Sequence, residues 1–522
     1  MQKLLTDYQV QQFIVDGCLS LHPDVEAAVH ASIDAQVREA IETEFHMGNN
    51  VVARVPQLWE VLRSPVIHGA VVSLLGPNYY VHPHRAIHTS TPVEDKSVEI
   101  AADQSGPTMG KGSRAGSGWH QDAQSPLSRA RHHTPKYLIG FYFPHETPEL
   151  MGPTRYQAGS YLYSEPVTPS GVVLADKIEA GTFLLLHFDT VHAGWPNRTD
   201  LTRYMLKFIF VRTDQPNAPT WNHRSPLWSV PECTNSEKDF TGAWTYIWSW
   251  LRGTDFEPTN GASLFNDLNV IDQEKRLAAI YTDNSENIEN LLLQIESLAG
   301  KDLHDRRLAK NRNGEIVPRD HVIGAERRWN ERAIVWDDAT YALIALGESA
   351  LQPILDRLET ASDPWVIMNL LFALGELGLK AESAVPKMTE FIKHPLQQVV
   401  RTALDALAAI GSGLNDTFDS IDSLFDSSNP DWQDAEVMRG WTGEDQIRLN
   451  AVFLLLNAIN GDHNLTEIER ILEKALGDKN GYVSAVAIEG LTRIGTESSN
   501  ALALRFLYDR RWDETMRVYK PF

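Results

Sequence analysis

The second half of the chain repeats one pattern, an Ala- and Leu-rich helical stretch that ends in a glycine turn. The pattern recurs in segments 341–358, 372–392, 403–413, 451–463 and 487–496. The turn glycines stand 31, 33, 50 and 34 residues apart, and the longest step carries an extra loop near 427–445; they are Gly347, Gly378, Gly411, Gly461 and Gly495. Helical pairs at a nearly fixed period cannot bury their apolar faces alone, so they must stack into a solenoid.

This half resembles HEAT-type repeats of short period. The resemblance implies an all-α domain over residues 266–522, with 272–300 as a first, capping unit and 301–330 as an insertion. Solenoids of this kind present extended surfaces to other molecules. We therefore expect the repeats to contact a protein partner or to form a homodimer.

Residues 1–215 follow a different pattern. Helical spacing at 7–16, 24–43 and 57–75 gives way to segments rich in aromatic and β-branched residues, which predict strands at 79–88, 136–143, 181–189 and 203–212. The glycine-rich stretch 90–118 is typical of a surface loop. A helical start followed by many separate strands predicts a β-sandwich or barrel with helices on one side.

Residues 216–265 join the two parts and are rich in tryptophan. We interpret this segment as a tether that holds the domains together through buried aromatic rings, in preference to a ligand-stacking platform; its indoles are Trp221, Trp228, Trp244, Trp248 and Trp250.

Charge and cysteine content exclude several classes of function. The net charge of −22 argues against binding to nucleic acid or to an anionic membrane. Residues 1–260 hold 20 basic and 27 acidic side chains and residues 261–522 hold 27 and 42, so most of the acidity belongs to the repeats. Two cysteines, with neither a signal-peptide pattern nor a long apolar run, predict a cytoplasmic protein.

A candidate metal motif follows the glycine-rich loop. His120 and Asp122 are two residues apart, so on an extended segment both side chains point to one side, and His192 lies at the end of a predicted strand. Two imidazoles and one carboxylate on one face of a metal leave positions open, an arrangement suited to ferrous iron that binds a cosubstrate and O₂.

A second His-x-Asp pattern, His187 and Asp189, lies three residues before His192. A site built from these three residues would take all its ligands from one short stretch, with no second element to close it. We favour the first set and expect Asp189 to orient the turn that presents His192.

Arg203 strengthens the first set. It begins the strand that follows His192, and a guanidinium pairs with a carboxylate through two parallel hydrogen bonds. One strand from the metal is where the distal carboxylate of a five-carbon diacid chelating iron would lie. The alternative for a single arginine is a surface ion pair.

Several segments in order resemble the phytanoyl-CoA dioxygenase (PhyH-like) family of Fe(II)/2-oxoglutarate oxygenases. They are LTDYQVQQFIVDG (5–17), GWHQD (118–122), MGPTRYQAGSY (151–161), with Tyr161 where a histidine is usual, and HAGWPNRTDLTRY (192–204). The resemblance implies a double-stranded β-helix, a cupin-like jelly roll, over residues 1–215. It implies that His120, Asp122 and His192 bind Fe(II), that Arg203 holds 2-oxoglutarate, and that O₂ is the second cosubstrate. Because Asp122 is present, it implies hydroxylation with release of succinate and CO₂ rather than halogenation.

Further pocket candidates are less specific. His82, His84 and His88 share strand parity, and His88 falls near a position where relatives contact 2-oxoglutarate or substrate. Arg129 and Arg131 lie in a basic run that would suit an anionic substrate, although such runs are usually solvated. The aromatic residues of the next strand could line the pocket or belong to the core; they are Tyr137, Phe141 and Tyr142.

The leading hypothesis is a hydroxylase of a small organic substrate that depends on iron and 2-oxoglutarate. Two alternatives stay open. The oxygenase fold could be catalytically idle and act as a scaffold through its repeats, or the repeats could recruit a protein that is itself the substrate.

Overall fold

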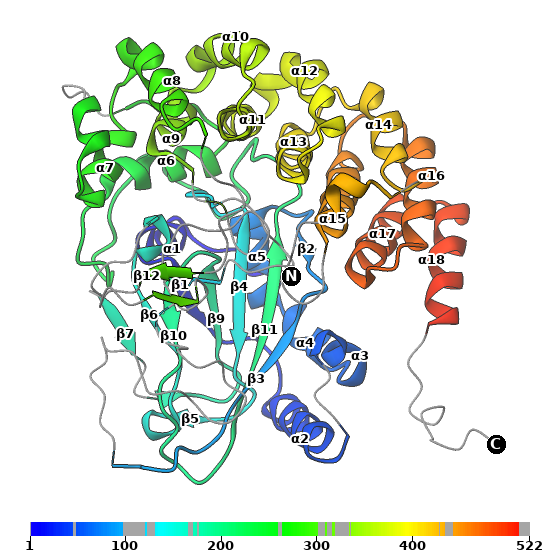
Figure 1. Cartoon of the computed structure of the whole chain (residues 1–522). Helices are drawn as coiled ribbons and strands as arrows, with labels where there is room; N and C mark the ends of the chain where they lie inside the picture. The colour runs from blue at the N-terminus through cyan, green and yellow to red at the C-terminus, as the bar shows by residue number, and fades with distance from the viewer. Residues whose placement is uncertain are drawn as a thin grey trace.

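The computed structural model shows a β domain covered at one end by an arc of helices (Figure 1). It describes residues 2–44, 48–97, 119, 121–122, 131–164, 171–174, 177–258, 264–300, 308–310, 316–318, 334, 336–426, 428–433 and 442–510. The prediction of a jelly-roll-type β domain followed by helical repeats is confirmed.

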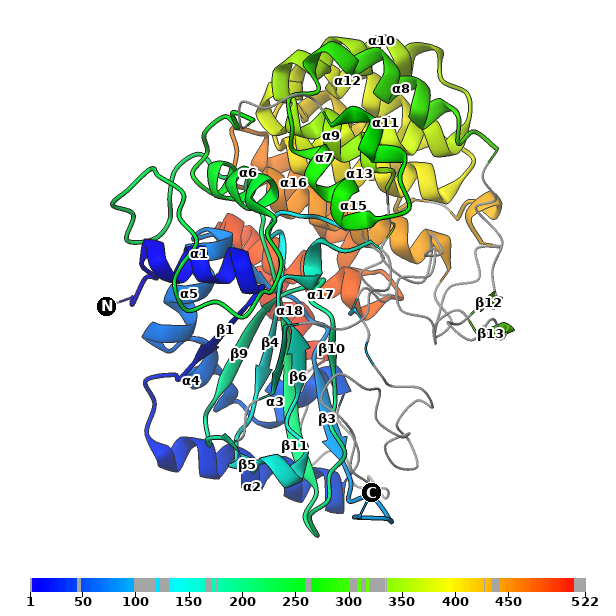
Figure 2. The same cartoon turned by 90° about the vertical axis from the view of Figure 1, so that its left-hand side faces the viewer.

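The larger sheet of the β domain is antiparallel and has the order β1-β9-β4-β11-β2, with β3 also paired to β11. Its strands are β1 (Cys18–Leu21), β2 (Tyr80–Val81), β3 (Ala86–Ser90), β4 (Tyr137–Tyr142), β9 (Phe183–His187) and β11 (Arg203–Val211). Every residue of β4, β9 and β11 is buried, because layers cover both faces of the sheet. Figure 2 shows these long strands side by side.

A smaller antiparallel sheet has the order β10-β6-β7, from β6 (Arg155–Gln157), β7 (Val172–Leu174) and β10 (His192–Ala193). Strands β5 (Thr147–Pro148) and β8 (Lys177–Ile178) form a further pair. The predicted strand 79–88 is in fact two strands, β2 and β3, separated by residues 82–85. His82 and His84 therefore lie in a connection and do not share a strand with His88.

Five helices precede or flank the sheet: α1 (Asp7–Asp16), α2 (Ala27–Thr43), α3 (Val51–Arg54), α4 (Leu58–Leu62) and α5 (Pro65–Leu75). The expected helix 57–75 is divided into α4 and α5, because Ser64 caps the second helix and Pro65 occupies its first position. The Nδ1 atom of His30 in α2 lies 2.7 Å from the hydroxyl of Tyr142, which fixes α2 against the face of the sheet that Tyr142 presents.

The tryptophan-rich segment packs as an aromatic cluster around α6 (Thr241–Leu251). Trp248 is almost fully buried, with the ring of Trp221 5.3 Å away, and the indole of Trp221 donates a hydrogen bond to Asp7 of α1. The last strand of the β domain ends at Val211, and the helical array begins with α7 (Gln273–Ile280). Domain boundaries near residues 215 and 265 stay a prediction.

The array continues with α8 (Ile288–Glu296), a hairpin of β12 (Leu308–Lys310) and β13 (Ile316–Pro318), and ten further helices. These are α9 (Asp338–Ala345), α10 (Leu351–Thr360), α11 (Pro364–Glu376), α12 (Val385–Glu390), α13 (Gln397–Ile410), α14 (Phe418–Ser423), α15 (Gly443–Ala458), α16 (Leu465–Leu476), α17 (Gly481–Ile494) and α18 (Glu497–Asp509). Gly411 and Gly495 end α13 and α17 with φ near +70°, the left-handed conformation that glycine adopts without strain.

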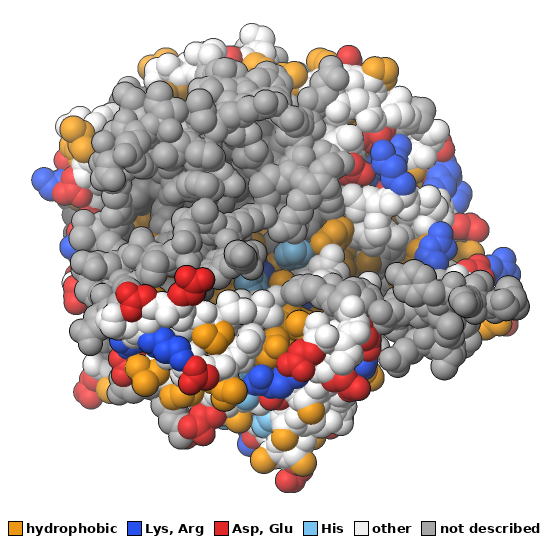
Figure 3. Space-filling view, turned by 60° about the horizontal axis from the view of Figure 1, so that its bottom comes forward, with side chains coloured by type: hydrophobic (Ala, Val, Ile, Leu, Met, Phe, Trp, Pro, Cys, Tyr) orange, Lys and Arg blue, Asp and Glu red, His pale blue; other side chains and the backbone are white. Residues whose placement is uncertain are grey.

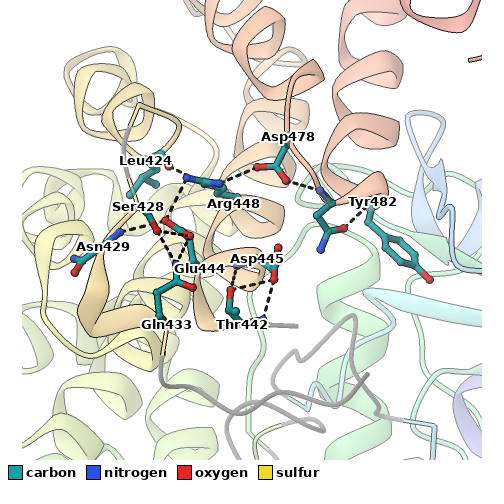
Figure 4. Close-up of polar contacts among 11 residues, drawn as sticks. Leu424, Ser428, Asn429, Gln433, Thr442, Glu444, Asp445, Arg448, Asp478 and Tyr482 are labelled. Carbon is teal, nitrogen blue, oxygen red and sulfur yellow. Dashed lines mark hydrogen bonds and ion pairs between the residues drawn. The ribbon is translucent and has the colours of Figure 1, made fainter. Parts of the chain in front are cut away.

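Helices α9, α11, α13, α15 and α17 form an inner row that faces the β domain, and the intervening helices form an outer row (Figure 1). Hydrogen bonds and ion pairs between side chains join successive repeats. Figure 4 shows Arg448 between Glu444 and Asp478, with Glu444 also holding the loop around Ser428. Tyr482 lies at the end of this group, and its hydroxyl bonds to His84 and Asn49 of the β domain.

The inner row contacts the β domain along its length. His82 stacks on Phe453 of α15 with ring centroids 5.6 Å apart, and Arg493 of α17 donates to the carbonyls of Asn78 and Tyr79. Lys136 forms an ion pair with Glu376 of α11. The concave side of the solenoid is therefore filled by the chain's own β domain. None of the described helices has the length and apolar character needed to cross a lipid bilayer.

Candidate active site

Asp122, His192 and Lys207 lie together, and Arg203 lies on the same face of the strand that carries Lys207. Asp122 lies in the segment before β4, His192 begins β10, and Arg203 and Lys207 both lie on β11. His120 and Arg129, which the sequence also nominates, fall outside the described residues. Among the described residues alone, no group of three metal-ligating side chains gathers.

His192 and Asp122 face each other, with Nε2 of the imidazole 3.9 Å from Oδ2 of the carboxylate. Nδ1 of His192 lies 2.9 Å from the carbonyl oxygen of Thr190 and must donate to it, because a carbonyl can only accept. Burial, the largest effect, lowers the pKa of His192 and so favours the neutral ring. The second ring nitrogen, Nε2, lies on the side of Asp122.

The donor atoms suit a divalent metal. Two ligands that each lie roughly 2.1 Å from one ion and share one face of it are about 3 Å apart. The observed 3.9 Å would have to shorten for both atoms to bind one ion in that way. The hydrogen bond from Nδ1 to a backbone carbonyl is the usual way in which a metal-ligating histidine is oriented.

Lys207 is the residue that sequence reasoning missed. Its ammonium lies 2.5 Å from Oδ2 of Asp122, and only 7% of the residue is exposed. Lys207 follows Arg203 by four residues, so both side chains point to the same face of β11. A single lysine inside the otherwise apolar run MLKFIFV was the signal that could have identified it.

Arg203 is buried, and burial lowers its pKa to about 10. It donates a hydrogen bond to the carbonyl of Gly152, whereas its Nε has no acceptor among the residues that the structure describes. Among the described residues no carboxylate lies within ion-pair distance of this guanidinium. A buried cation with spare donors calls for an anionic ligand.

Gly152 is specifically required beside Arg203. It has φ near +73°, and a Cβ atom there would lie 2.2 Å from the carbonyl oxygen of Trp195. The turn between β5 and β6 can thus approach the turn after β10 only with glycine at this position.

The second His-x-Asp pattern has another use. Nε2 of His187 lies 3.2 Å from the carbonyl oxygen of Thr134, and its Nδ1 accepts a hydrogen bond from the backbone N–H of Asp189. Burial lowers the pKa of His187 to about 3, and the ring stacks on Tyr161. Both ring nitrogens are engaged, so His187 has no lone pair to give to a metal.

The sheet register places the remaining candidates. Phe141 is paired with Lys207 across β4 and β11, so it lies on the same face, and its ring is 5.1 Å from that of His192. His88 is exposed and is paired with Met205, between Arg203 and Lys207 on that face. Tyr142 points to the opposite face, toward α2, and is not brought to the pocket.

Tyr137 and Arg131 lie closer to the solenoid. Tyr137 lines a cavity of about 60 Å³ between the domains, together with His132, Lys136 and Glu376. Arg131 is buried, its Nε 3.9 Å from Oδ1 of Asp189, and its guanidinium donates to the carbonyl of Tyr163. The described contacts of Arg131 join segments of the protein to one another.

The surface of the β domain carries mixed charge. In the view of Figure 3, acidic and basic side chains are interspersed over the part that the structure describes.

Comparisons with known proteins bear mainly on the solenoid. A family model described as HEAT repeats matches residues 351–438, which confirms the repeats predicted there. No curated protein matches the sequence.

Similar solved structures include the apo form of the non-heme monooxygenase ThoJ, at 17% identity and a TM-score of 0.28, covering 46% of this chain and 94% of that one. The non-heme alpha ketoglutarate dependent carbocyclase SnoK from nogalamycin biosynthesis has 17% identity and a TM-score of 0.30, covering 40% and 85%. EctD from S. alaskensis, with 2-oxoglutarate and 5-hydroxyectoine, has 14% identity and a TM-score of 0.30, covering 44% and 84%. We base the function on the residues of this chain.

Proposed function

We propose that the β domain is an Fe(II)/2-oxoglutarate-dependent oxygenase that hydroxylates a small anionic organic substrate. One observation carries the proposal: Nε2 of His192 lies 3.9 Å from Oδ2 of Asp122 while Nδ1 donates to a backbone carbonyl, and Arg203 lies buried without an ion-paired carboxylate among the described residues. The order of these residues in the sequence, and its resemblance to the phytanoyl-CoA dioxygenase family, support the same activity.

Each residue has a defined part in this proposal. His120, Asp122 and His192 would hold the metal, and the guanidinium of Arg203 would pair with the distal carboxylate of 2-oxoglutarate. When bound, the iron with 2-oxoglutarate and O₂ supplies the oxidation of a substrate C–H bond, with release of succinate and CO₂. Phe141 packs beside His192 and limits the access of water to that ligand.

The charge balance of the site supports an anionic substrate. The charges of a divalent metal and the dianion of 2-oxoglutarate cancel each other, and Asp122 balances one of the two buried cations that β11 carries, Lys207 and Arg203. This set of groups therefore keeps one positive charge. A carboxylate, sulfonate or phosphate on the substrate would compensate it, with His88 placed between the two cations at the open side.

Turnover of 2-oxoglutarate tests the activity. Purified protein with Fe(II) and ascorbate should convert 2-oxoglutarate to succinate slowly without substrate, and His192→Ala should abolish this conversion. His22→Ala, a change at an exposed histidine, is the control and should leave the rate unchanged. Equal succinate formation by wild type and His192→Ala would refute the assignment.

A catalytically idle scaffold is the second candidate, and the ion pair between Lys207 and Asp122 is the observation in its favour. An ammonium held on the carboxylate competes with a metal for that carboxylate. A wild-type protein that takes up no Fe(II) under anaerobic reconstitution would favour this alternative.

Recruitment of a protein substrate by the concave face of the repeats is disfavoured, because the inner row already packs on the β domain. The outer row is the surface that we propose for a partner or a second copy of the chain.

Both cysteines are free, which suits a reducing compartment such as the cytoplasm.

A further inference from the structure

We propose that the solenoid is part of the apparatus that positions the metal ligand His192, and that Tyr341 of α9 is its key positioning residue. The link is segment 131–136, which lies between the solenoid and the turn that precedes β10. This inference rests on the proposed function, since it assigns the solenoid a role at the same site.

The solenoid holds segment 131–136 by contacts along its length. The hydroxyl of Tyr341 donates to the carbonyl of Arg131 over 2.9 Å, and the N–H of Arg131 donates to the carbonyl of Ile334 over 2.9 Å. The ring of His133 stacks on that of Tyr341, with centroids 4.3 Å apart and planes 12° apart. His132 and, at the other end of the segment, Lys136 both contact Glu376 of α11.

Segment 131–136 in turn holds the turn at residues 187–190. His187 donates through Nε2 to the carbonyl of Thr134 over 3.2 Å. The guanidinium of Arg131 lies 3.9 Å from the carboxylate of Asp189, and both residues are at least 95% buried. These contacts form in a low-dielectric interior, where hydrogen bonds and ion pairs are stronger than in water.

The turn then fixes the metal ligand. His187 accepts the N–H of Asp189 on its ring and the N–H of Thr190 on its carbonyl. The carbonyl of Thr190 accepts the hydrogen bond from Nδ1 of His192, and this bond orients the ring so that Nε2 lies on the side of Asp122. A displacement of segment 131–136 would therefore rotate or loosen the imidazole of His192 through Thr190.

Tyr341 is well suited to a test because one atom makes the critical bond. Tyr341→Phe keeps the stacking on His133 and removes only the hydrogen bond to Arg131. Tyr482→Phe is a matched control, because it removes a hydroxyl that bonds from α17 to His84 and Asn49 of the β domain, at a different place in the same interface. Glu376→Gln weakens the other anchor of segment 131–136 and gives a second, independent variant.

We expect Tyr341→Phe to weaken Fe(II) binding by roughly 2- to 30-fold, the range of couplings carried through packed networks, and Tyr482→Phe to leave it unchanged. Amide hydrogen exchange of residues 187–192, measured without metal, should become faster in Tyr341→Phe and in Glu376→Gln but not in the control. Unchanged exchange, unchanged Fe(II) affinity, or equal effects of the two tyrosine changes would each overturn the inference. A wild-type protein that binds no Fe(II) would instead refute the proposed function, and the exchange result would still report on the positioning.

Discussion

At the scale of single residues, the site depends on side chains that are buried with incomplete partners. Within the described part of the chain, Nε of Arg203 has no acceptor, and the ammonium of Lys207 pairs with Asp122. Such groups cost stability in the unliganded protein, because burying a charge is unfavourable unless it is paired. We infer that bound ligands offset this loss of stability by pairing with the buried charges.

Arg203→Lys is expected to retain the positive charge and lose the forked pair of donors. A hydrogen bond to a charged group contributes about 1.5–3 kcal/mol, so 2-oxoglutarate should bind roughly 10- to 150-fold more weakly. A binding titration with a redox-inert divalent metal in the site measures this directly. Arg38→Lys on α2 is the control, because Arg38 covers the ring of the neighbouring Tyr204 from outside the pocket. Unchanged affinity in Arg203→Lys would remove the cosubstrate role from this arginine.

Gly152→Ala is expected to destabilise the fold by roughly 1–3 kcal/mol, because alanine would be strained at this φ and its Cβ would meet the backbone of Trp195. Gly48→Ala is a matched control: Gly48 has φ near +55°, but nothing lies within 4 Å of a Cβ there. Urea unfolding midpoints compare the two variants. We expect the unfolding midpoint to decrease more in Gly152→Ala than in Gly48→Ala. Equal decreases would mean that the close approach to Trp195 does not contribute to the loss of stability.

At the scale of elements, local patterns predicted much of the fold. Strands β4, β9 and β11 and the repeated helices follow from their apolar periodicity and from their glycine and proline boundaries. The helix expected at 57–75 is divided at Ser64 and Pro65, and this helix start signal is visible in the sequence. Strict alternation along β4 would have placed Tyr142 and Phe141 on opposite faces of the sheet. Lys207 could also have been predicted, because it lies four residues after Arg203 and so on the same face of the strand.

Other features could not be predicted from local patterns. The contacts of Arg131 and His133 with Tyr341 join residues about 200 positions apart, and nothing in either segment alone specifies the other. Arg131 was proposed as a substrate contact from its charge, whereas its described partners belong to the protein itself. Which segments meet across two domains depends on the packing of the whole chain.

At the scale of the whole molecule, the solenoid encloses part of the β domain, and the interface contains buried titratable groups. Burial and the neighbouring Arg131 lower the pKa of His133 to about 3, from an ordinary value of 6.5. Burial alone would raise the pKa of Glu376, but Lys136 and His132 beside it lower the pKa to about 2, from 4.5. The folded state therefore binds fewer protons than the unfolded chain in acid.

Acid should consequently lower the free energy of unfolding. The unfolded chain takes up protons at His133 below pH 6.5 and at Glu376 below pH 4.5, so stability is fully present above pH 6.5 and decreases as the pH falls. Urea unfolding midpoints measured from pH 7 to pH 4 should decrease, with a shallower slope between pH 6.5 and pH 4.5 in His133→Asn. A midpoint that stays constant or rises over this range would contradict the burial of a neutral His133 in the interface.

The central claim is that Asp122 and His192 contribute to one iron site. Iron content after anaerobic reconstitution with Fe(II) and removal of unbound metal tests it most directly, in the wild type and in Asp122→Ala. We predict iron in stoichiometric amount in the wild type and its loss in Asp122→Ala, with the unfolding midpoint of each variant confirming that it is folded. A folded wild-type protein without iron, or an Asp122→Ala variant that retains the same iron content, would contradict the account.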